Sequence, residues 1–305
     1  MELRNIQKHL QEELLGQDRL IELSLAAILA GGHLLLEGPP GVGKTSLARL
    51  LAESFGGSFR RVQMTSDLLP SDILGVLRPA RDMRDFEFRK GPIFSNFLLA
   101  DELNRTGPKT QSALLEAMAE GTVTVDGVAY SLPDPFFVIA TQNPVESHGV
   151  YPLAESQLDR FMILVWVGLP PEKEELAIYE SRSESRARSR AEFPNSMESL
   201  KEARNQIAKV HIESSVLEYA HSIIKATRSH PEIAHGVSVR GGLQYLSAAR
   251  ALAYLRGRDF VHPSEMRDLS VAVLAHRLSL AMGSGELEPK RRIISDIVST
   301  LKHPR

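Results

Sequence analysis

The sequence has 305 residues, more than one typical core of ~100 to 150 residues, so we expect two domains or one domain with a large appendage. Its 36 Lys and Arg residues nearly balance 38 Asp and Glu residues, which gives no reason to expect nucleic acid or an anionic membrane as a partner and favours protein partners. Cysteine is absent, which excludes disulfides, thiolate metal sites and cysteine nucleophiles and agrees with a reducing compartment.

The first segment, 1–13, is polar and carries acids and bases alike, so it does not have the composition of a secretory signal. No apolar run in the sequence approaches the ~20 residues that a membrane-spanning helix needs. We therefore expect a soluble cytoplasmic protein without membrane insertion.

Helices and strands alternate in the next part of the chain. Leu20, Leu23, Ala27 and Ala30 recur at helical spacing, and two glycines follow them. A strand, a glycine-rich loop, a second helix and a second strand come next, which is the order that a parallel α/β sheet requires. The predicted elements are a helix at 18–30, a strand at 33–37, a helix at 45–55 and a strand at 59–64.

The glycine-rich loop reads Gly-Pro-Pro-Gly-Val-Gly-Lys-Thr and matches the phosphate-binding pattern G-x-x-x-x-G-K-[ST] behind a predicted strand. Glycine lets successive backbone N–H groups point into one concavity, and the following helix adds the positive end of its dipole. Lys44 would reach the β- and γ-phosphates of a nucleoside triphosphate, and the Thr45 hydroxyl would contact Mg²⁺. The residues expected at the nucleotide here are Gly38, Pro39, Pro40, Gly41, Val42, Gly43, Lys44, Thr45 and Ser46.

Three more strands are predicted after the first two. Each is a short apolar run with little alternation, as expected for a strand that helices cover on both faces. The runs are 97–101, 136–141 and 162–167, and a helix at 109–120 lies between the first and the second.

Two irregular pieces interrupt this alternation. Residues 122–125 and 128–132 are joined by Asp126-Gly127, which predicts a hairpin with a type I′ turn that projects from the sheet. The charged segment 78–90 carries two phenylalanines at alternate positions, which is a weaker hairpin signal.

The strand at 97–101 ends in two adjacent acids, Asp101 and Glu102. In a parallel sheet this end faces the same edge as the phosphate loop. Asp101 would hold Mg²⁺, directly or through a water, and Glu102 would orient the attacking water or accept its proton. Acids also cap helices and end strands, but the upstream phosphate loop favours the catalytic interpretation.

Three further polar residues are candidates for the same chemistry. The strand at 136–141 delivers Asn143 to this edge, where its amide could hold the attacking water, although Asn before proline is also an ordinary turn residue. Arg160 could form a surface ion pair or supply the cation that phosphoryl transfer needs in its transition state. Arg240 begins a helix, where the helix dipole mildly disfavours a cation, and this position invites a ligand.

Beyond the last strand the composition changes. Segment 181–190 is rich in Ser, Arg and Glu and predicts an exposed helix end or linker. Helical stripes then recur, and Pro263 suits the first position of a helix. We expect a core at 1–170, a linker or exposed helix at 171–195 and an all-helical domain at 196–305. The apolar stripes are Val216, Ala220, Ile223 and Ile224, then Leu243, Leu246 and Ala249, and finally Met266, Leu269 and Val273.

Several stretches together resemble the MoxR family of AAA+ ATPases. The runs Asp-Glu-Leu-Asn-Arg from Asp101 and Gln-Leu-Asp-Arg-Phe to Phe161 make the resemblance specific. It spans nearly the whole chain, and departs from the family at Ala154, where proline is usual, and at Gly241-Gly242, where bulkier helix formers are usual. The similar stretches are 38–45, 98–105, 109–118, 140–144, 151–161 and 237–277, with Gly16-Gln17 near the start.

The resemblance implies a P-loop AAA+ αβα sandwich with a parallel central sheet, followed by a smaller all-helical lid domain. It implies a ring, expected to be a hexamer, with ATP bound between subunits. In this ring Asn143 would be sensor 1, Arg160 the arginine finger offered to the neighbouring subunit, and Arg240 the sensor 2 arginine. Gly16 and Gln17 would lie beside the adenine, and the two irregular pieces would face the pore and touch substrate.

The predicted function is hydrolysis of ATP, with Mg²⁺, to remodel a client protein or assist its maturation. The resemblance suggests a client with a von Willebrand factor A domain. Alternatives are a nucleic-acid-dependent AAA+ motor or loader, which the balanced charge disfavours, and a P-loop kinase, which has no use for an arginine finger or this lid. A nucleotide-gated interaction subunit with little hydrolysis is disfavoured by the intact set Lys44, Asp101, Glu102 and Arg160.

Overall fold

The computed structural model describes residues 2–80, 85–143, 149–183, 193, 196–282, 286–302 and 304. The chain divides into two compact units. The first contains residues 1–21, 35–153 and 166–198, and the second contains residues 22–34, 154–165 and 199–305. The boundaries expected at 170 and 195 stay a prediction, and most of the expected linker after residue 183 lies outside the described residues.

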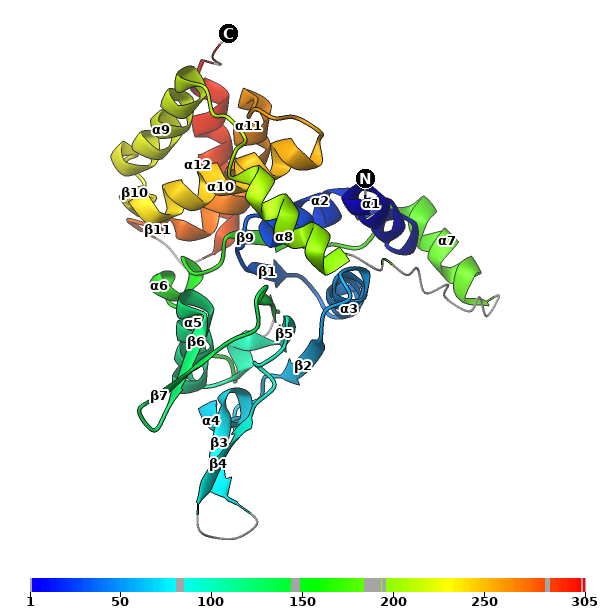
Figure 1. Ribbon diagram of the computed structural model, residues 1–305. Coiled ribbons are helices and arrows are strands. Elements are labelled where there is room, and N and C mark those ends of the chain that lie inside the picture. The colour runs from blue at the N-terminus through cyan, green and yellow to red at the C-terminus, as the bar shows by residue number, and fades with distance from the viewer. Residues whose placement is uncertain are drawn as a thin grey trace. The chain divides into compact units, whose positions relative to one another are not determined.

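A five-stranded sheet with the order β2-β5-β8-β1-β9 confirms the predicted α/β fold class (Figure 1). β2 pairs with β5, and β5 with β8, in parallel. Every residue of β5 is buried, as is every residue of β8 except the last, as expected for strands covered on both faces. The strands are β1 (Leu34–Glu37), β2 (Phe59–Gln63), β5 (Phe97–Asp101), β8 (Phe137–Gln142) and β9 (Ile163–Trp166).

The helix after the phosphate loop, α3 (Lys44–Ser54), packs on β5. Phe55, which ends this helix, stacks with Phe97 at a ring-centroid distance of 6.0 Å. The predicted helices at 18–30 and 109–120 are also present. They are α2 (Asp18–Leu29) and α5 (Pro108–Glu120). α7 (Glu172–Ser183) lies in the segment that was expected to be a linker or an exposed helix, and the helices that the sequence patterns did not predict are α1 (Glu2–Glu13), α4 (Pro70–Leu74), η1 (Leu103–Arg105) and α6 (Glu155–Leu158).

Both irregular pieces form antiparallel hairpins. β6 (Thr122–Val125) pairs with β7 (Val128–Ser131), and the φ angles of 51° and 78° at the two turn residues fit the predicted type I′ turn. β3 (Gly75–Pro79) pairs with β4 (Phe86–Lys90), so this hairpin begins before the predicted segment, and residues 81–84 lie outside the described residues. Phe88 stacks on Tyr130 at 4.2 Å, so the two hairpins are in contact.

The C-terminal part is helical, as predicted, and also contains a small sheet. β10 (Ile233–His235) pairs antiparallel with β11 (Ser279–Leu280). Pro263 occupies the predicted first position of its helix. The helices are α8 (Ser196–Ile207), α9 (Ser214–Ser229), α10 (Val239–Leu255), α11 (Pro263–Leu274), η2 (Ala275–Arg277) and α12 (Leu287–Thr300).

Two of the three predicted helical stripes are buried as expected, whereas on α10 Ala249 is the only one of the three predicted residues that is fully buried. Leu243 is 62% exposed, whereas Gly241, Gly242 and Tyr245 are buried. The reason is close packing: an added Cβ at Gly241 would lie 2.9 Å from Val237 and 3.1 Å from Arg277. The face with the smallest residues therefore turns inward, and a count of large apolar residues misplaces it.

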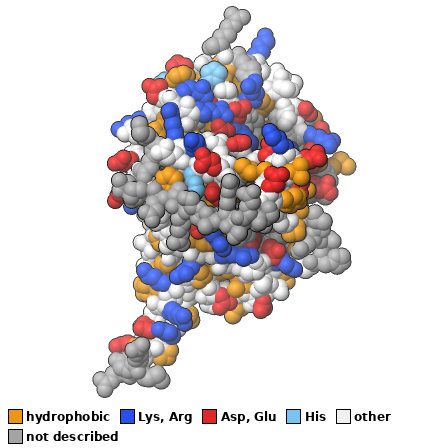
Figure 2. All heavy atoms as spheres, turned by 90° about the vertical axis from the view of Figure 1, so that its right-hand side faces the viewer, with side chains coloured by type: hydrophobic (Ala, Val, Ile, Leu, Met, Phe, Trp, Pro, Cys, Tyr) orange, Lys and Arg blue, Asp and Glu red, His pale blue; other side chains and the backbone are white. Residues whose placement is uncertain are grey.

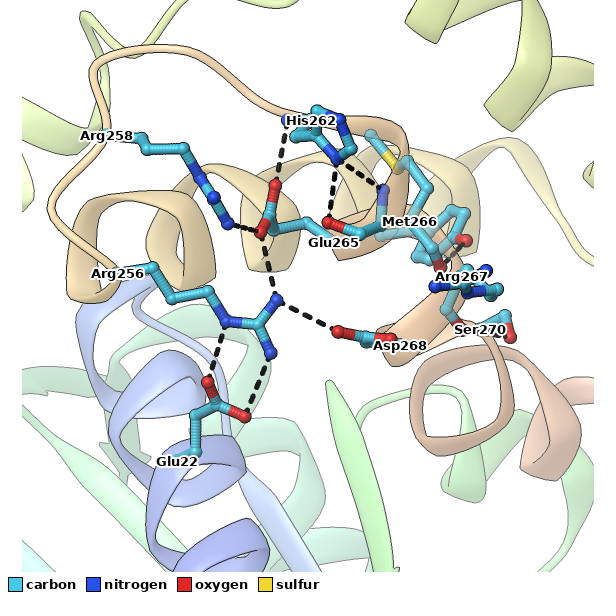
Figure 3. Close-up of polar contacts among 11 residues, drawn as sticks. Glu22, Arg256, Arg258, His262, Glu265, Met266, Arg267, Asp268 and Ser270 are labelled. Atoms are coloured by element: carbon cyan, nitrogen blue, oxygen red, sulfur yellow. Dashed lines mark hydrogen bonds and ion pairs between the residues drawn. The ribbon is translucent and has the colours of Figure 1, made fainter. Parts of the chain in front are cut away.

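An ion-pair network joins α2, α10 and α11 within the second unit (Figure 3). Arg256 donates to both carboxylate oxygens of Glu22, at 2.8 and 3.2 Å. The same guanidinium donates to Asp268 at 2.9 Å and to Glu265 at 3.0 Å, and Glu265 is fully buried. Arg258 also donates to Glu265. A buried carboxylate needs such partners, because an unpaired buried charge is costly.

The surface carries charges of both signs. On the face drawn in Figure 2, Lys and Arg side chains are interspersed with Asp and Glu among the described residues. Within the described part of the chain, no helix is both long enough and apolar enough to span a bilayer.

Candidate functional site

The phosphate loop connects β1 to α3 and depends on glycine at several positions. Gly41 and Gly43 have φ angles of 84° and 94°, in the region that favours glycine. An added Cβ at either would meet nothing within 4 Å, so there is open space beside the loop at both positions. Gly38 requires glycine for a different reason, because a Cβ there would lie 2.2 Å from the carbonyl oxygen of Val167. This cradle fits a phosphate chain.

Lys44 folds back over its own loop. Its Nζ donates to the carbonyl oxygens of Gly38 and Pro39, the latter at 3.2 Å. Burial lowers the pKa of this ammonium, and the negative charges of Asp101, Glu102 and Glu37 partly offset that effect. Three carboxylates therefore lie near Lys44. Thr45 and Ser46 follow in the first turn of α3, and both are partly exposed.

Asp101 is buried at the end of β5, and its two oxygens have different partners. Oδ1 accepts from the Thr141 hydroxyl at 2.6 Å. Oδ2 accepts from Arg61 of β2, from Nε at 3.0 Å and from Nη2 at 2.7 Å. A positive group thus already compensates the charge of this carboxylate.

Glu102 has a strained backbone. Its φ of 61° and ψ of 50° lie in the left-handed region, which costs a residue other than glycine of order 1 kcal/mol or more. Its N–H donates to the Thr141 hydroxyl at 2.8 Å, and its carboxylate accepts from Gln63 at 2.5 Å and Arg105 at 2.9 Å. These contacts fix the carboxylate at the end of the sheet.

Asn143 follows β8 on the next strand. It is 9% exposed, and its carbonyl oxygen accepts from Asn104 at 3.3 Å. The preceding Gln142 donates to Glu37, at the end of β1. Since β5, β8 and β1 are adjacent, the structure places the acids, Asn143 and the phosphate loop at one edge of the sheet. Pro144, which follows, lies outside the described residues.

Gly16 and Gln17 lie beside the segment that follows the sheet. Gln17 Nε2 donates to the carbonyl oxygen of Gly168 at 3.5 Å, and a Cβ at Gly16 would lie 2.9 Å from Pro171. Gly16 has a φ of 73°. Gly16 and Gln17 therefore pack against the segment that follows β9, and their expected place beside an adenine stays a prediction.

The two predicted arginines lie in the second compact unit, whereas the loop and the acids lie in the first. Arg160 follows α6 and is partly exposed. Arg240 is exposed in the first turn of α10, where the Ser238 hydroxyl accepts from the Gly241 N–H at 3.0 Å and caps the helix.

Sequence reasoning missed four residues of this edge. Arg61 and Gln63 lie at alternate positions of β2 and so share a face, which a period-two analysis of polar residues in that strand could have found. Glu37 ends the buried strand β1 and Thr141 is the last buried residue of β8, and both resemble ordinary strand residues in the sequence. The described residues contain no group of three or more His, Asp or Glu that could hold a metal. Magnesium bound with a nucleotide needs only one or two protein ligands, so the roles expected of Thr45 and Asp101 do not require such a group and stay a prediction.

Comparison with known proteins agrees with this geometry. A family model described as "ATPase family associated with various cellular activities (AAA)" matches residues 33–163, and an "AAA lid domain" model matches 225–297. The chain is 45% identical to YeaC of Bacillus subtilis over 97% of this chain and 93% of that protein. It is 38% identical to chaperone MoxR1 of Mycobacterium tuberculosis over 96% and 80% of the two chains. The crystal structure of a candidate ATPase from Cytophaga hutchinsonii superposes with a TM-score of 0.89 and 36% identity over 100% of this chain and 95% of that one.

Proposed function

This chain belongs to the MoxR family of AAA+ ATPases, and we propose that it hydrolyses ATP to ADP and phosphate in order to remodel a client protein or assist its maturation. Membership in the family implies nucleotide binding. The observation that supports hydrolysis is the meeting of the open glycine cradle, Lys44, Asp101 and Glu102 at one sheet edge. This set combines phosphate binding with a carboxylate that can act on water.

The loop binds the triphosphate through its backbone N–H groups and the start of α3. Lys44 exchanges the carbonyl oxygens of Gly38 and Pro39 for phosphate oxygens, which accept more strongly because they are charged. Thr45 and Asp101 would hold Mg²⁺, which supplies neutralisation of the charge on the phosphates. Asp101 exchanges part of its contact with Arg61 for this role.

Glu102 orients the attacking water and takes its proton. Gln63, Arg105 and Thr141 hold it in place, so little reorganisation is needed when ATP binds. Asn143 presents a neutral amide to the same water without adding charge. Glu102 is therefore the group whose loss should affect turnover much more than binding.

The arginines complete the site at a junction between copies of the chain. Arg160 supplies positive charge to the γ-phosphate held by a neighbouring subunit, and Arg240 contacts the nucleotide from the lid. Gly16 and Gln17 border the adenine. The assembly is a ring, and six copies is the expected number.

The client is a protein, and a von Willebrand factor A domain is the candidate that the family suggests. Support comes from the relative named as a chaperone and from the interspersed surface charges in Figure 2, which do not form a basic track on that face among the described residues. The two hairpins, joined at Phe88 and Tyr130, are the surfaces that would contact the client.

The test compares two variants of the full chain with the parent. Lys44→Ala should lose nucleotide binding, whereas Glu102→Gln should bind ATP and fail to release phosphate. The Glu102→Gln protein should also retain its client during purification, because it stays in the ATP state. Phosphate release by Glu102→Gln at the parental rate would overturn the assignment of Glu102.

A further inference from the structure

The segment that carries Arg160 is held on both sides by one buried arginine of the same compact unit. Arg277, in η2, has a side chain that is 1% exposed. Its Nη1 donates to the carbonyl oxygen of Asp159 at 3.2 Å and also to the Asp159 carboxylate. Its Nη2 donates to the carbonyl oxygen of Phe161 at 2.7 Å. The residues immediately before and after Arg160 are therefore fixed by a single planar group.

Neighbouring contacts strengthen this hold. The His276 ring nitrogen Nε2 contacts the same Phe161 carbonyl oxygen at 3.0 Å, and Phe161 itself is fully buried. Arg160 donates its own N–H to the carbonyl oxygen of Gln157 at 3.2 Å. The backbone around Arg160 thus has few conformations, although its side chain is partly exposed.

The guanidinium of Arg277 also contacts the lid helix that carries Arg240. Its Nη2 donates to Gln244, which lies one turn after Arg240 on α10. Gly241 makes room for it, since a Cβ there would lie 3.1 Å from Arg277 Cδ. Burial lowers the pKa of Arg277 most, the Asp159 carboxylate raises it in part, and the positive charge of Arg240 lowers it further.

From this geometry we propose that Arg277 is a positioning residue for Arg160, which places the cation that each subunit offers to the ATP of its neighbour. The inference rests on the proposed function, because it needs Arg160 to act in trans. The shape of the group explains why arginine is required. A planar fork can hold two carbonyl oxygens and a carboxylate at once, whereas the single nitrogen of lysine cannot span them.

If Arg277 only stabilised the lid, it would make the same contacts. The test must therefore separate an effect on the position of Arg160 from an effect on the stability of the lid. Mixed assemblies provide this separation. A Lys44→Ala subunit cannot bind ATP but can donate Arg160, and an Arg160→Ala subunit binds ATP but lacks the donated cation. Mixing the two should restore turnover, and absence of this restoration would overturn the trans assignment in the proposed function together with the inference that rests on it.

Arg277→Lys is then introduced into one partner at a time. In the Lys44→Ala donor it should reduce the restored turnover on the order of 10²-fold, the loss that a misplacement of about 1 Å causes. In the Arg160→Ala acceptor, Arg160 is absent and only Arg240 can be displaced, through the contact of Arg277 with Gln244, so the loss should be much smaller than in the donor. Equal losses in the two orientations, or no loss in the donor, would overturn the role of Arg277 and leave the proposed function standing.

Two further variants complete this comparison, one as a control and one as a substitute for Arg277→Lys. Arg256→Lys in the donor is the matched control, because Arg256 is a second lid arginine that pairs with carboxylates, but among the described residues its ion pairs are with Glu22, Glu265 and Asp268. It should leave the restored turnover unchanged. If Arg277→Lys does not fold, Asp159→Asn in the donor removes one of the same contacts, and a loss confined to the donor orientation is again the expected result. A loss in both orientations contradicts the proposal.

Discussion

The Thr141 hydroxyl donates a hydrogen bond to Asp101 Oδ1 over 2.6 Å. The oxygen of the Thr141 hydroxyl also accepts from the N–H of Glu102 over 2.8 Å, so one hydroxyl contacts both Asp101 and Glu102. Because Glu102 has a left-handed backbone conformation, it needs such a contact to keep its position.

Removal of the Thr141 hydroxyl should displace both Asp101 and Glu102 from their positions. Thr141→Val keeps the shape of the side chain and leaves a buried carboxylate oxygen and a buried N–H without their partner, at a cost of about 1–3 kcal/mol in the free energy of unfolding. ATP turnover should fall on the order of 10²-fold, because both groups shift. Urea unfolding and phosphate release measure the two effects. Thr141→Ser should behave much like the parent, and an equally inactive Thr141→Ser would contradict the role of the hydroxyl.

Arg61 contacts Asp101, the proposed magnesium ligand, so the two cations would compete for this carboxylate. The Arg61 side chain is 48% exposed, so its ion pair with Asp101 contributes at most about 1 kcal/mol. Arg61→Gln should therefore lower the Mg²⁺ concentration at half-maximal turnover by up to about fivefold. Arg60→Gln, an exposed neighbour on the same strand, is the control and should leave this concentration unchanged. A higher Mg²⁺ requirement in Arg61→Gln would contradict the competition.

The lid network in Figure 3 predicts a large loss of stability at one position. Arg256→Ala leaves the fully buried carboxylate of Glu265 with fewer compensating charges and should lower the free energy of unfolding by about 3–5 kcal/mol. Arg292→Ala removes a pair with an exposed residue of α12 at 3.7 Å and should produce no measurable change. Unfolding of the two variants in guanidinium chloride measures these changes in the free energy of unfolding. Similar losses would show that burial is not the cause.

His276 predicts a dependence of stability on pH. It is fully buried, burial lowers its pKa well below the ordinary value, and Arg277 lowers it further. Among the described residues, its Nδ1 has no hydrogen-bond partner. The unfolded chain then binds a proton below about pH 6.5 that the folded chain excludes, so stability falls as the pH falls, by up to about 1.4 kcal/mol per unit.

The change in unfolding free energy between pH 6.5 and pH 5 measures this effect. His276→Gln should have a shallower pH slope than the parent, whatever its stability at neutral pH. His221→Gln, at an exposed position of α9, should keep the parental slope. Identical slopes in all three proteins would rule out the contribution of His276.

The sequence predicted the strands and the phosphate loop well because these features depend on local patterns. Short apolar runs identify β5 and β8, and the spacing of glycines around Lys44 identifies the loop. The polar contacts of Arg61, Gln63 and Thr141 could not be predicted from local sequence patterns, because they join residues that are about 40 positions apart. The buried face of α10 was misread for a related reason. Glycine fits at position 241 because Val237 and Arg277, the latter from η2, occupy the space that a side chain would fill.

The central claim is that ATP is hydrolysed at a junction between two copies of this chain, one of which provides Lys44 and Glu102 and the other Arg160. ATP turnover in mixtures of Lys44→Ala and Arg160→Ala proteins tests it most directly. Arg160→Ala alone should be slower than the parent on the order of 10³-fold, and Lys44→Ala alone should be inactive. The account predicts that the mixture is far more active than the sum of the two proteins measured separately. A mixture no more active than that sum would contradict it.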